Sequence, residues 1–143
     1  SIGSFSKNNA LNKEVILPIL KNTTKFSTKK ESISDTILPI FTIQRFEIIS
    51  DVFKQVKIFV TISRSLNKKN MIRVCEEIVK ENQGYSNFII CLFSDSQSGL
   101  ELAQGNNSNV TNKEKRSEWL AMYTLNPVEG AYFDDEPARH NSF

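Results

Sequence analysis

Histidine and cysteine are scarce in this sequence, and their scarcity excludes several kinds of chemistry. The single histidine, His140, lies three residues from the end of the chain. A serine or cysteine nucleophile needs a base held rigidly within hydrogen-bond reach, so catalysis by His140 is disfavoured. Two cysteines in 143 residues are too few for a disulfide scaffold. Without histidine partners they do not indicate a zinc site, and we predict neither a metal nor a cofactor.

Long apolar runs and glycine-rich motifs are also missing. No apolar run approaches the ~18 residues that a membrane-spanning helix needs, so we expect no span. The five glycines are isolated, and no phosphate-binding loop of the G-x-x-x-x-G-K-[ST] type occurs. The chain contains 15 isoleucines and 10 phenylalanines. This is too much apolar surface for a fully disordered chain, so full disorder is excluded. Its 143 residues suit one domain.

The net charge of +2 is unevenly distributed. Residues 1–30 carry six lysines against one glutamate, a net charge of +5, which leaves −3 for residues 31–143. A basic arm can bind nucleic acid or anionic lipid through counterion release. These lysines are scattered, however, and residues 1–30 contain no arginine, which is the better phosphate ligand. We therefore interpret residues 1–36 as a basic, partly extended arm or tether and regard nucleic-acid contact as disfavoured.

Residues 41–62 predict a β-hairpin. Apolar and polar residues alternate over 41–49, with a slip of phase between Ile43 and Phe46 that indicates a bulge. A turn follows, and residues 55–62 then alternate cleanly, which predicts a strand with one wholly apolar face.

Residues 67–82 carry the strongest helix signal, because their apolar side chains form one stripe. Asn67 or Ser65 can cap the first turn, and Gly84 suits the position just after the last turn. The unbroken apolar run 88–93 then predicts a buried strand. This strand and the one at 55–62 should be parallel, because a helix connects them.

The last part of the chain is less regular. Residues 94–117 predict a long polar loop, and 118–124 and 130–133 predict two more strands. Residues 134–143 form an acidic polar tail. For residues 37–133 we therefore predict one α+β domain: a two-layer sandwich in which a mixed sheet of about four to five strands carries one long helix on one face.

Four polar side chains follow the predicted parallel strands or begin the next strand. Arg64 comes after the first strand, Ser94 and Asp95 after the second, and Glu118 starts the third. Ligands of open α/β sheets bind beyond the carboxyl ends of the strands, so these residues predict a small-ligand or hydrolytic site. The alternative is that they are ordinary turn residues.

Aromatic residues near the C-terminus have acidic rather than basic neighbours, which disfavours stacking on nucleic-acid bases. Core packing is favoured, with an aromatic left over for a protein partner, and Trp119 and Tyr132 are the candidates. Cys75 and Cys91 fall on predicted apolar surfaces. We interpret them as core thiols, with a disulfide as the alternative.

A resemblance to small uncharacterised bacterial α+β domains runs from residue 41 to 133. It is carried by four segments: the strand Val56–Ile62, the helix from Asn67, the run Tyr85-Ser-Asn-Phe-Ile-Ile-Cys-Leu-Phe93 and the strand Glu118-Trp-Leu-Ala-Met-Tyr123. Such domains often follow a lipoprotein or secretory leader. The resemblance therefore implies a cell-envelope or exported protein, and it implies no catalytic residue. The tether-like start of the chain favours an exported, tethered protein, but the basic, Pro-interrupted segment 1–36 departs from the resemblance.

The favoured function is that of a non-enzymatic bacterial domain that acts through protein contacts. It rests on the lack of a credible set of acid, base, nucleophile or metal ligands. A small-ligand or hydrolytic site at Arg64, Asp95 and Glu118 is the first alternative. Nucleic-acid contact through the basic arm is the second. The sequence leaves the protein partner and the oligomeric state open.

Overall fold

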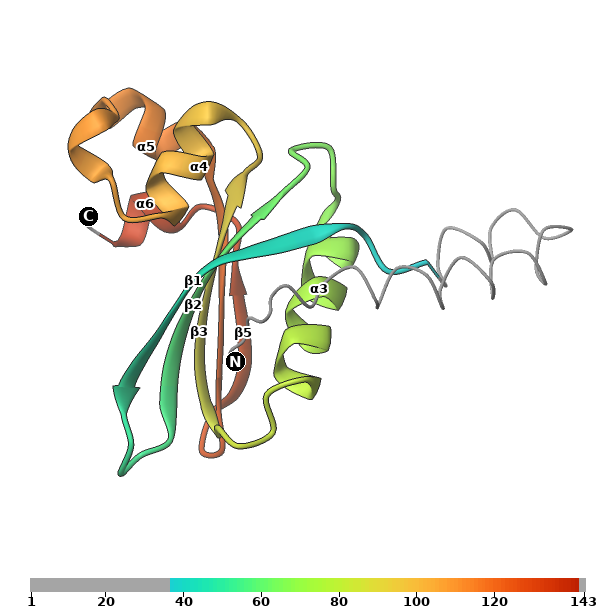
Figure 1. The fold of residues 1–143 in the computed structure, drawn as a ribbon. Coiled ribbons are helices and arrows are strands. Elements are labelled where there is room, and N and C mark those ends of the chain that lie inside the picture. The colour runs from blue at the N-terminus through green and yellow to red at the C-terminus, as the bar shows by residue number, and fades with distance from the viewer. Residues whose placement is uncertain (1–36, 142–143) are drawn as a thin grey trace, which may run out of the picture. The chain divides into compact units, whose positions relative to one another are not determined.

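A computed structural model describes residues 37–141, and all its helices and strands belong to the compact unit that begins at Phe41 (Figure 1). The basic arm at 1–36 lies outside the described residues. The elements are, in order, β1 (Phe41–Ser50), β2 (Gln55–Ile62), α3 (Lys68–Lys80), β3 (Asn87–Ser94), α4 (Gln97–Ala103), the 3-10 turn η2 (Asn107–Asn109), α5 (Asn112–Glu118), β4 (Trp119–Asn126), β5 (Gly130–Asp134) and α6 (Pro137–His140).

The five strands form one mixed sheet in the order in which they occur along the chain. β2 and β3 are parallel, and the other neighbouring pairs are antiparallel. The predicted α+β class, the mixed sheet and the parallel pair are therefore confirmed. The predicted bulge is also confirmed, because the register of β1 against β2 shifts between Ile43 and Arg45.

α3 begins where the sequence predicts. The Asn67 side chain accepts a hydrogen bond from the backbone N–H of Asn70 at 2.9 Å, and so caps the first turn. The last helical residue is Lys80, and the Asn82 side-chain amide donates to the carbonyl of Ile78 at 2.7 Å. The helix thus ends earlier than predicted, and Gly84 does not take the position after its last turn.

The larger core lies between α3 and one face of the sheet. Val74, Cys75 and Ile78 of α3 belong to one buried cluster with alternate residues of β2, β3 and β4. The strand members of this cluster are Val56, Ile58, Val60, Ile62, Phe88, Ile90, Leu92, Ala121 and Tyr123. Burying one such side chain stabilises the fold by about 1.5–3 kcal/mol, so this cluster is the main support of the domain.

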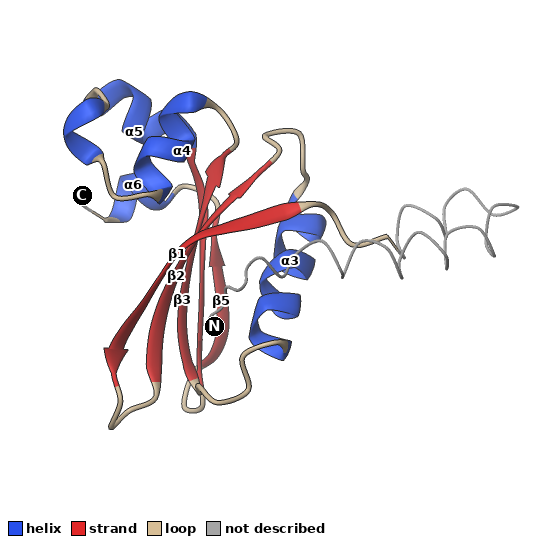
Figure 2. Ribbon diagram, viewed as in Figure 1, coloured by secondary structure: helices blue, strands red, loops and turns tan. Residues whose placement is uncertain are grey.

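The other face of the sheet carries a second, smaller core, which corrects the expectation of a single helical layer. Its buried members are Phe59, Cys91, Phe93, Leu102, Ala103, Val110 and Trp119. Leu102 and Ala103 belong to α4, so this core packs the sheet against the group formed by α4, α5 and α6, which Figure 2 shows together. Residues 94–117, predicted as a polar loop, thus form two helices and a 3-10 turn, and the predicted tail contains the end of β5 and α6.

Arg45 of β1 fastens this helical group to the sheet. Its guanidinium lies 3.6 Å from the centre of the Phe59 ring, and its Nε donates to the carbonyl of Ala103 at 3.3 Å. Gly105 follows α4 with φ of 89°, and a Cβ there would lie 3.3 Å from the guanidinium carbon. The positive φ favours glycine at this position, and a Cβ there would also press on the Arg45 guanidinium.

The two ends of the sheet differ. At one end, which we call the capped end, β2 and β3 finish and lead into the loops before α3 and α4 (Figure 1). The opposite end, which we call the hairpin end, holds the β1–β2 and β4–β5 turns. The helical group lies toward the capped end, and the β1–β2 turn projects away from it. Within residues 37–141, no helix combines the length and apolar character needed to cross a membrane.

Candidate functional site

Three of the four predicted site residues meet at the capped end. The Arg64 guanidinium forms an ion pair with the carboxylate of Glu118, and the Ser94 hydroxyl donates to the same carboxylate oxygen, Oε1. Two further hydroxyls join them: Ser96 donates to Oε1 and Ser117 to Oε2, each at 3.0 Å. Arg64 also donates to the carbonyl of Ser117 at 3.1 Å. The carboxylate of Glu118 is therefore the centre of the network.

The electrostatics of this network keep Glu118 ionised. Burial alone would raise the pKa of Glu118, but the hydroxyls of Ser94, Ser96 and Ser117 and the charge of Arg64 together lower it below its ordinary value. A carboxylate with a lowered pKa and several donors already bound is a weak general base. The network consequently favours a structural carboxylate over a catalytic one.

Ser94 is chemically a potential nucleophile, but its position does not suit the role. Its side chain is only 1% exposed, and its hydroxyl contacts the Ser96 hydroxyl at 2.7 Å as well as Glu118. A nucleophile has to reach the reacting atom of its substrate. Asp95, the fourth predicted residue, is exposed, and no contact places it in the network.

A close backbone contact explains why these residues lie so near one another. Ser96 caps α4, since its hydroxyl accepts from the N–H of Gly99 at 3.0 Å. A Cβ on Gly99 would lie 2.0 Å from the carbonyl oxygen of Ser94 and 2.6 Å from its hydroxyl. Only glycine allows the first turn of α4 to pack this closely on the end of β3. The network thus joins the ends of β2 and β3 to the starts of α4 and β4.

No protein-family model matches this chain, and comparisons with curated proteins and with solved structures likewise return no match. The resemblance to small uncharacterised bacterial α+β domains, with the cell-envelope or exported location that it implies, stays a prediction. The functional argument therefore depends on the geometry of the chain itself.

The two aromatic residues predicted to bind a partner have different surroundings. Trp119 is buried in the smaller core, where its ring stacks on Phe93 with 6.2 Å between centroids. Tyr132 is exposed on β5, the edge strand opposite β1. Tyr132 is therefore available to another molecule, whereas Trp119 serves the core.

The remaining reactive side chains are held in structural positions. Cys75 and Cys91 are both buried and unbonded, and they belong to the cores on opposite faces of the sheet. Burial raises the pKa of Cys91 to about 11 and raises that of Cys75 still further from its usual range. His140 contacts Asp134 at 3.1 Å. Among residues 37–141, no three histidine, cysteine or acidic side chains lie close enough together to hold a metal ion.

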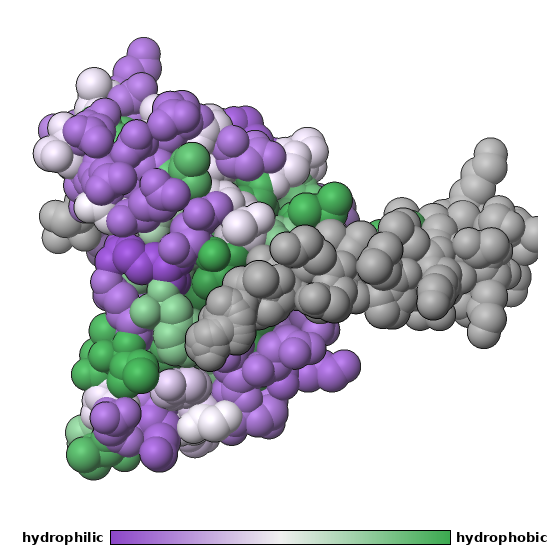
Figure 3. Space-filling model, in the orientation of Figure 1, coloured by the Kyte–Doolittle hydropathy of each residue, from purple (hydrophilic) through white to green (hydrophobic). Residues whose placement is uncertain are grey.

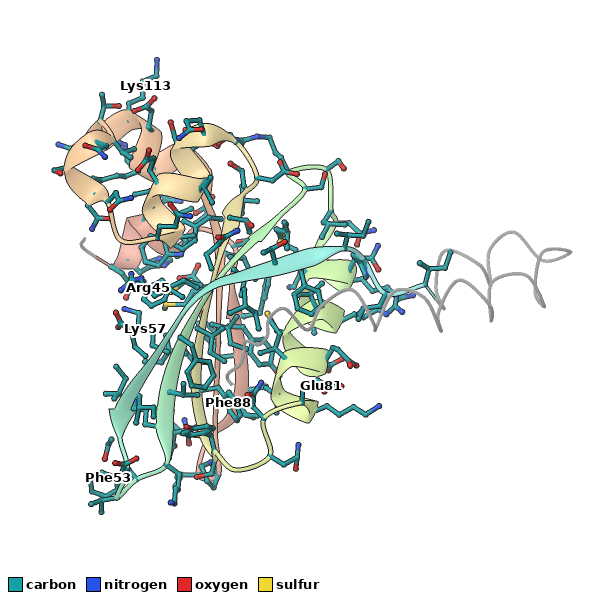
Figure 4. The ribbon with its side chains drawn as sticks, in the orientation of Figure 1. Arg45, Phe53, Lys57, Glu81, Phe88 and Lys113 are labelled. Atoms are coloured by element: carbon teal, nitrogen blue, oxygen red, sulfur yellow. The ribbon has the colours of Figure 1, made fainter. Side chains whose placement is uncertain are left out.

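The hairpin end presents apolar side chains that the sequence argument missed. Val52 and Phe53, in the turn between β1 and β2, are 83% and 71% exposed, and Ile48 and Ile49 at the end of β1 are exposed as well. We call these four residues the hairpin patch. Figure 3 shows a hydrophobic surface at this end of the molecule, and Figure 4 labels Phe53 at its tip. Turns favour Gly, Pro, Asn, Asp and Ser. The Val-Phe pair in the predicted turn was therefore the sequence signal that could have indicated this exposed apolar surface.

The backbone that carries the hairpin patch is firmly held. The carbonyl of Lys54 accepts from the N–H groups of Ser86 and Asn87 at 3.0 and 3.1 Å, and the Asn87 side chain donates to the carbonyl of Phe53. The Ser50 hydroxyl also accepts from the N–H of Phe53 at 3.1 Å. The turn is thus fastened to the start of β3, although its two apolar side chains point into solvent.

Charges around the hairpin patch are balanced. Asp51 and Lys54 lie in the turn itself, and Glu47 of β1 pairs across the hairpin with Lys57 of β2. An anionic membrane surface attracts clusters of basic residues, and this mixture lacks a basic excess. A mixed polar rim around apolar residues is instead typical of a protein interface.

Proposed function

We propose that this chain is a non-enzymatic protein-binding domain whose contact surface is the hairpin patch. One observation carries the proposal: Val52 and Phe53 are exposed on a turn whose backbone is fixed by hydrogen bonds to β3. A rigid apolar projection loses little conformational entropy on binding. Aromatic residues, phenylalanine among them, are also enriched in the buried centres of protein interfaces.

The capped end supports the non-enzymatic part of the proposal. Its polar side chains contact one another around Glu118, and the hydroxyl of Ser94 is shielded from solvent. The alternative of a small-ligand or hydrolytic site at Arg64, Asp95 and Glu118 requires polar side chains that can turn toward a ligand. Arg64 and Glu118 are already paired with each other, so we favour protein contact.

Photo-cross-linking in the cells that make the protein tests this proposal. A photoreactive phenylalanine analogue replaces Phe53 in one variant and Lys113, an exposed residue of α5, in the matched control. We expect a discrete cross-linked protein from position 53 and none from position 113. We also expect the double substitution Val52→Ser with Ile49→Ser to remove that product, and Arg64→Ala with Asp95→Ala to leave it.

Two results would overturn the proposal. One is equal cross-linking from positions 53 and 113, which would show that the hairpin patch has no preferred partner. The other is a product that survives the changes in the hairpin patch but disappears with Arg64→Ala and Asp95→Ala. That result would move the function to the capped end.

A further inference from the structure

β1 is an edge strand with one long side that no other described strand pairs. It has ten residues, and β2 is its one neighbour among the described strands. The opposite edge strand, β5, has five residues and leads into α6. β1 also lacks the lysines and prolines that usually protect exposed edges, and its only charged residues are Arg45 and Glu47. Such an edge can add a strand from another chain.

We propose that β1 pairs with β1 of a second copy of this chain, in the antiparallel direction and with Phe46 at the two-fold axis. A two-fold axis perpendicular to the sheet makes the two sheets continuous. The α3 faces of both copies then lie on the same side of the joined sheet. Within residues 45–48, the stretch of β1 without a register shift, one residue must then lie directly opposite itself. This requirement leaves few registers to choose from.

The charges of β1 select the register centred on Phe46. In that register, Arg45 of each copy lies opposite Glu47 of the other copy, so both charges meet an opposite charge. Centring the pair on Arg45 or on Glu47 would instead place like charges directly opposite each other, which is destabilising. Only the register centred on Phe46 places both charged residues opposite a residue of the opposite charge. This complementarity of β1 with itself indicates that a second copy of the chain pairs with the β1 edge.

The apolar side chains of β1 agree with this register. Phe46 pairs with Ile58 and Ile48 with Val56, both in the α3-side core, so Phe46 and Ile48 lie on the α3 face. They are 41% and 54% exposed in the single chain. Phe46 contacts Tyr85 edge to face, with 5.7 Å between ring centroids. In the pair, the two Phe46 rings would lie opposite each other and be covered further.

Arg45 can take part without giving up its contacts within the chain. It binds Glu47 of its own copy, the carbonyl of Ala103 and the ring of Phe59. A guanidinium has five N–H donors in a fixed plane, so it can bind a second carboxylate at the same time. The ion pair between Arg45 and Glu47 of each copy would thereby become a four-membered charge network.

This inference is independent of the proposed function. In an antiparallel pair centred on Phe46, the two β1–β2 turns point in opposite directions. Val52 and Phe53 of each copy would remain exposed, whereas Ile48 and Ile49, the two hairpin-patch residues that belong to β1, would lie within the paired strands.

Disulfide trapping in the full chain tests the pairing. In the Phe46→Cys variant, the two new thiols would lie opposite each other across an antiparallel pair, within the Cα separation that a disulfide needs. We expect mild oxidation to give a covalent dimer on a non-reducing gel. The control is Val52→Cys, at a more exposed position six residues away, where the two thiols would be about 40 Å apart. The native Cys75 and Cys91 are buried and do not compete. No dimer from Phe46→Cys, or equal dimer from both variants, would overturn the register.

Charge exchange provides a second, non-covalent test by sedimentation. Arg45→Glu alone and Glu47→Arg alone should each be monomeric, because like charges then meet across the axis. An equimolar mixture of the two variants should dimerise, as should the double variant Arg45→Glu with Glu47→Arg, which also keeps the pair within each chain. Wild-type protein of residues 1–143 that stays monomeric under the conditions of these assays would overturn the proposal. Residues 1–36 of the same chain would then be the next candidate to test at the β1 edge.

Discussion

The capped end and the hairpin end of the sheet use polar and apolar residues in opposite ways. At the capped end, the charged and hydroxyl side chains that suggest chemistry bind one another around Glu118. At the hairpin end, apolar side chains that would normally pack in a core are exposed on a fixed turn. Residue type alone therefore points to the capped end, whereas the contact surface that we propose lies at the hairpin end. What distinguishes the two ends is whether each side chain already has its partners within the chain.

The largest effect should come from filling the close contact at the capped end. Gly99→Ala would place a Cβ 2.0 Å from the carbonyl oxygen of Ser94, so α4 would have to move off the end of β3. We expect the free energy of unfolding to fall by about 3 kcal/mol, at the upper end of typical overpacking costs. Urea denaturation followed by circular dichroism measures this change.

Gly84→Ala is the matched control from the other end of the sheet. Gly84 lies in the exposed connection between α3 and β3, and a Cβ there would meet no atom within 4 Å. The unfolding free energy of the Gly84→Ala variant should stay within about 0.5 kcal/mol of the wild-type value. Similar losses for both variants would contradict the close packing of α4 on Ser94.

A smaller effect, dependent on pH, should follow from Glu118→Gln. The pKa of Glu118 is lowered in the folded state, so its carboxylate stabilises the fold above the ordinary carboxyl pKa of about 4.3. This contribution is lost as the pH falls through the lower, folded-state pKa. We expect Glu118→Gln to cost about 1–2 kcal/mol near pH 7 and progressively less below about pH 4.

Comparing wild type with Glu118→Gln at each pH isolates this carboxylate. Asp134 also has a lowered pKa, because the N–H of Glu136 and the His140 ring outweigh the effect of its burial. Both proteins keep Asp134, so its contribution cancels in the difference. A difference in unfolding free energy that does not change between pH 7 and pH 3 would show that Glu118 is not held as an ionised carboxylate.

The main strands and α3 could be predicted because their sequence signals are local. The alternation over 55–62, the apolar run 88–93 and the Asn67 cap each depend on neighbours a few residues away. The slip of phase in β1 predicted its bulge for the same reason. The predicted end of α3 was wrong because the side chain of Asn82, rather than a glycine, hydrogen-bonds a carbonyl of the last turn.

The helices within 94–117 were missed because their composition is polar and each is only seven residues long. One local signal was present. Thr111 and Glu114 form a capping box, with a hydrogen bond in each direction between side chain and backbone. The site was predicted in part: the topology brings Arg64, Ser94 and Glu118 together, but their burial and mutual bonding depend on contacts between residues distant in the sequence.

The smallest effect on stability should come from the hairpin patch. Val52→Ser combined with Phe53→Ser should change the free energy of unfolding by no more than about 0.5 kcal/mol, because both side chains are largely exposed and the turn keeps its backbone hydrogen bonds. The same urea titration used for Gly99→Ala measures it. A loss above about 1 kcal/mol would show that these side chains pack within the folded chain in solution, and the contrast between the two ends of the sheet would fail. Unchanged stability here, together with loss of the cross-link from position 53 in the Val52→Ser and Ile49→Ser variant, would instead separate the proposed binding role of the hairpin patch from the folding role of the capped end.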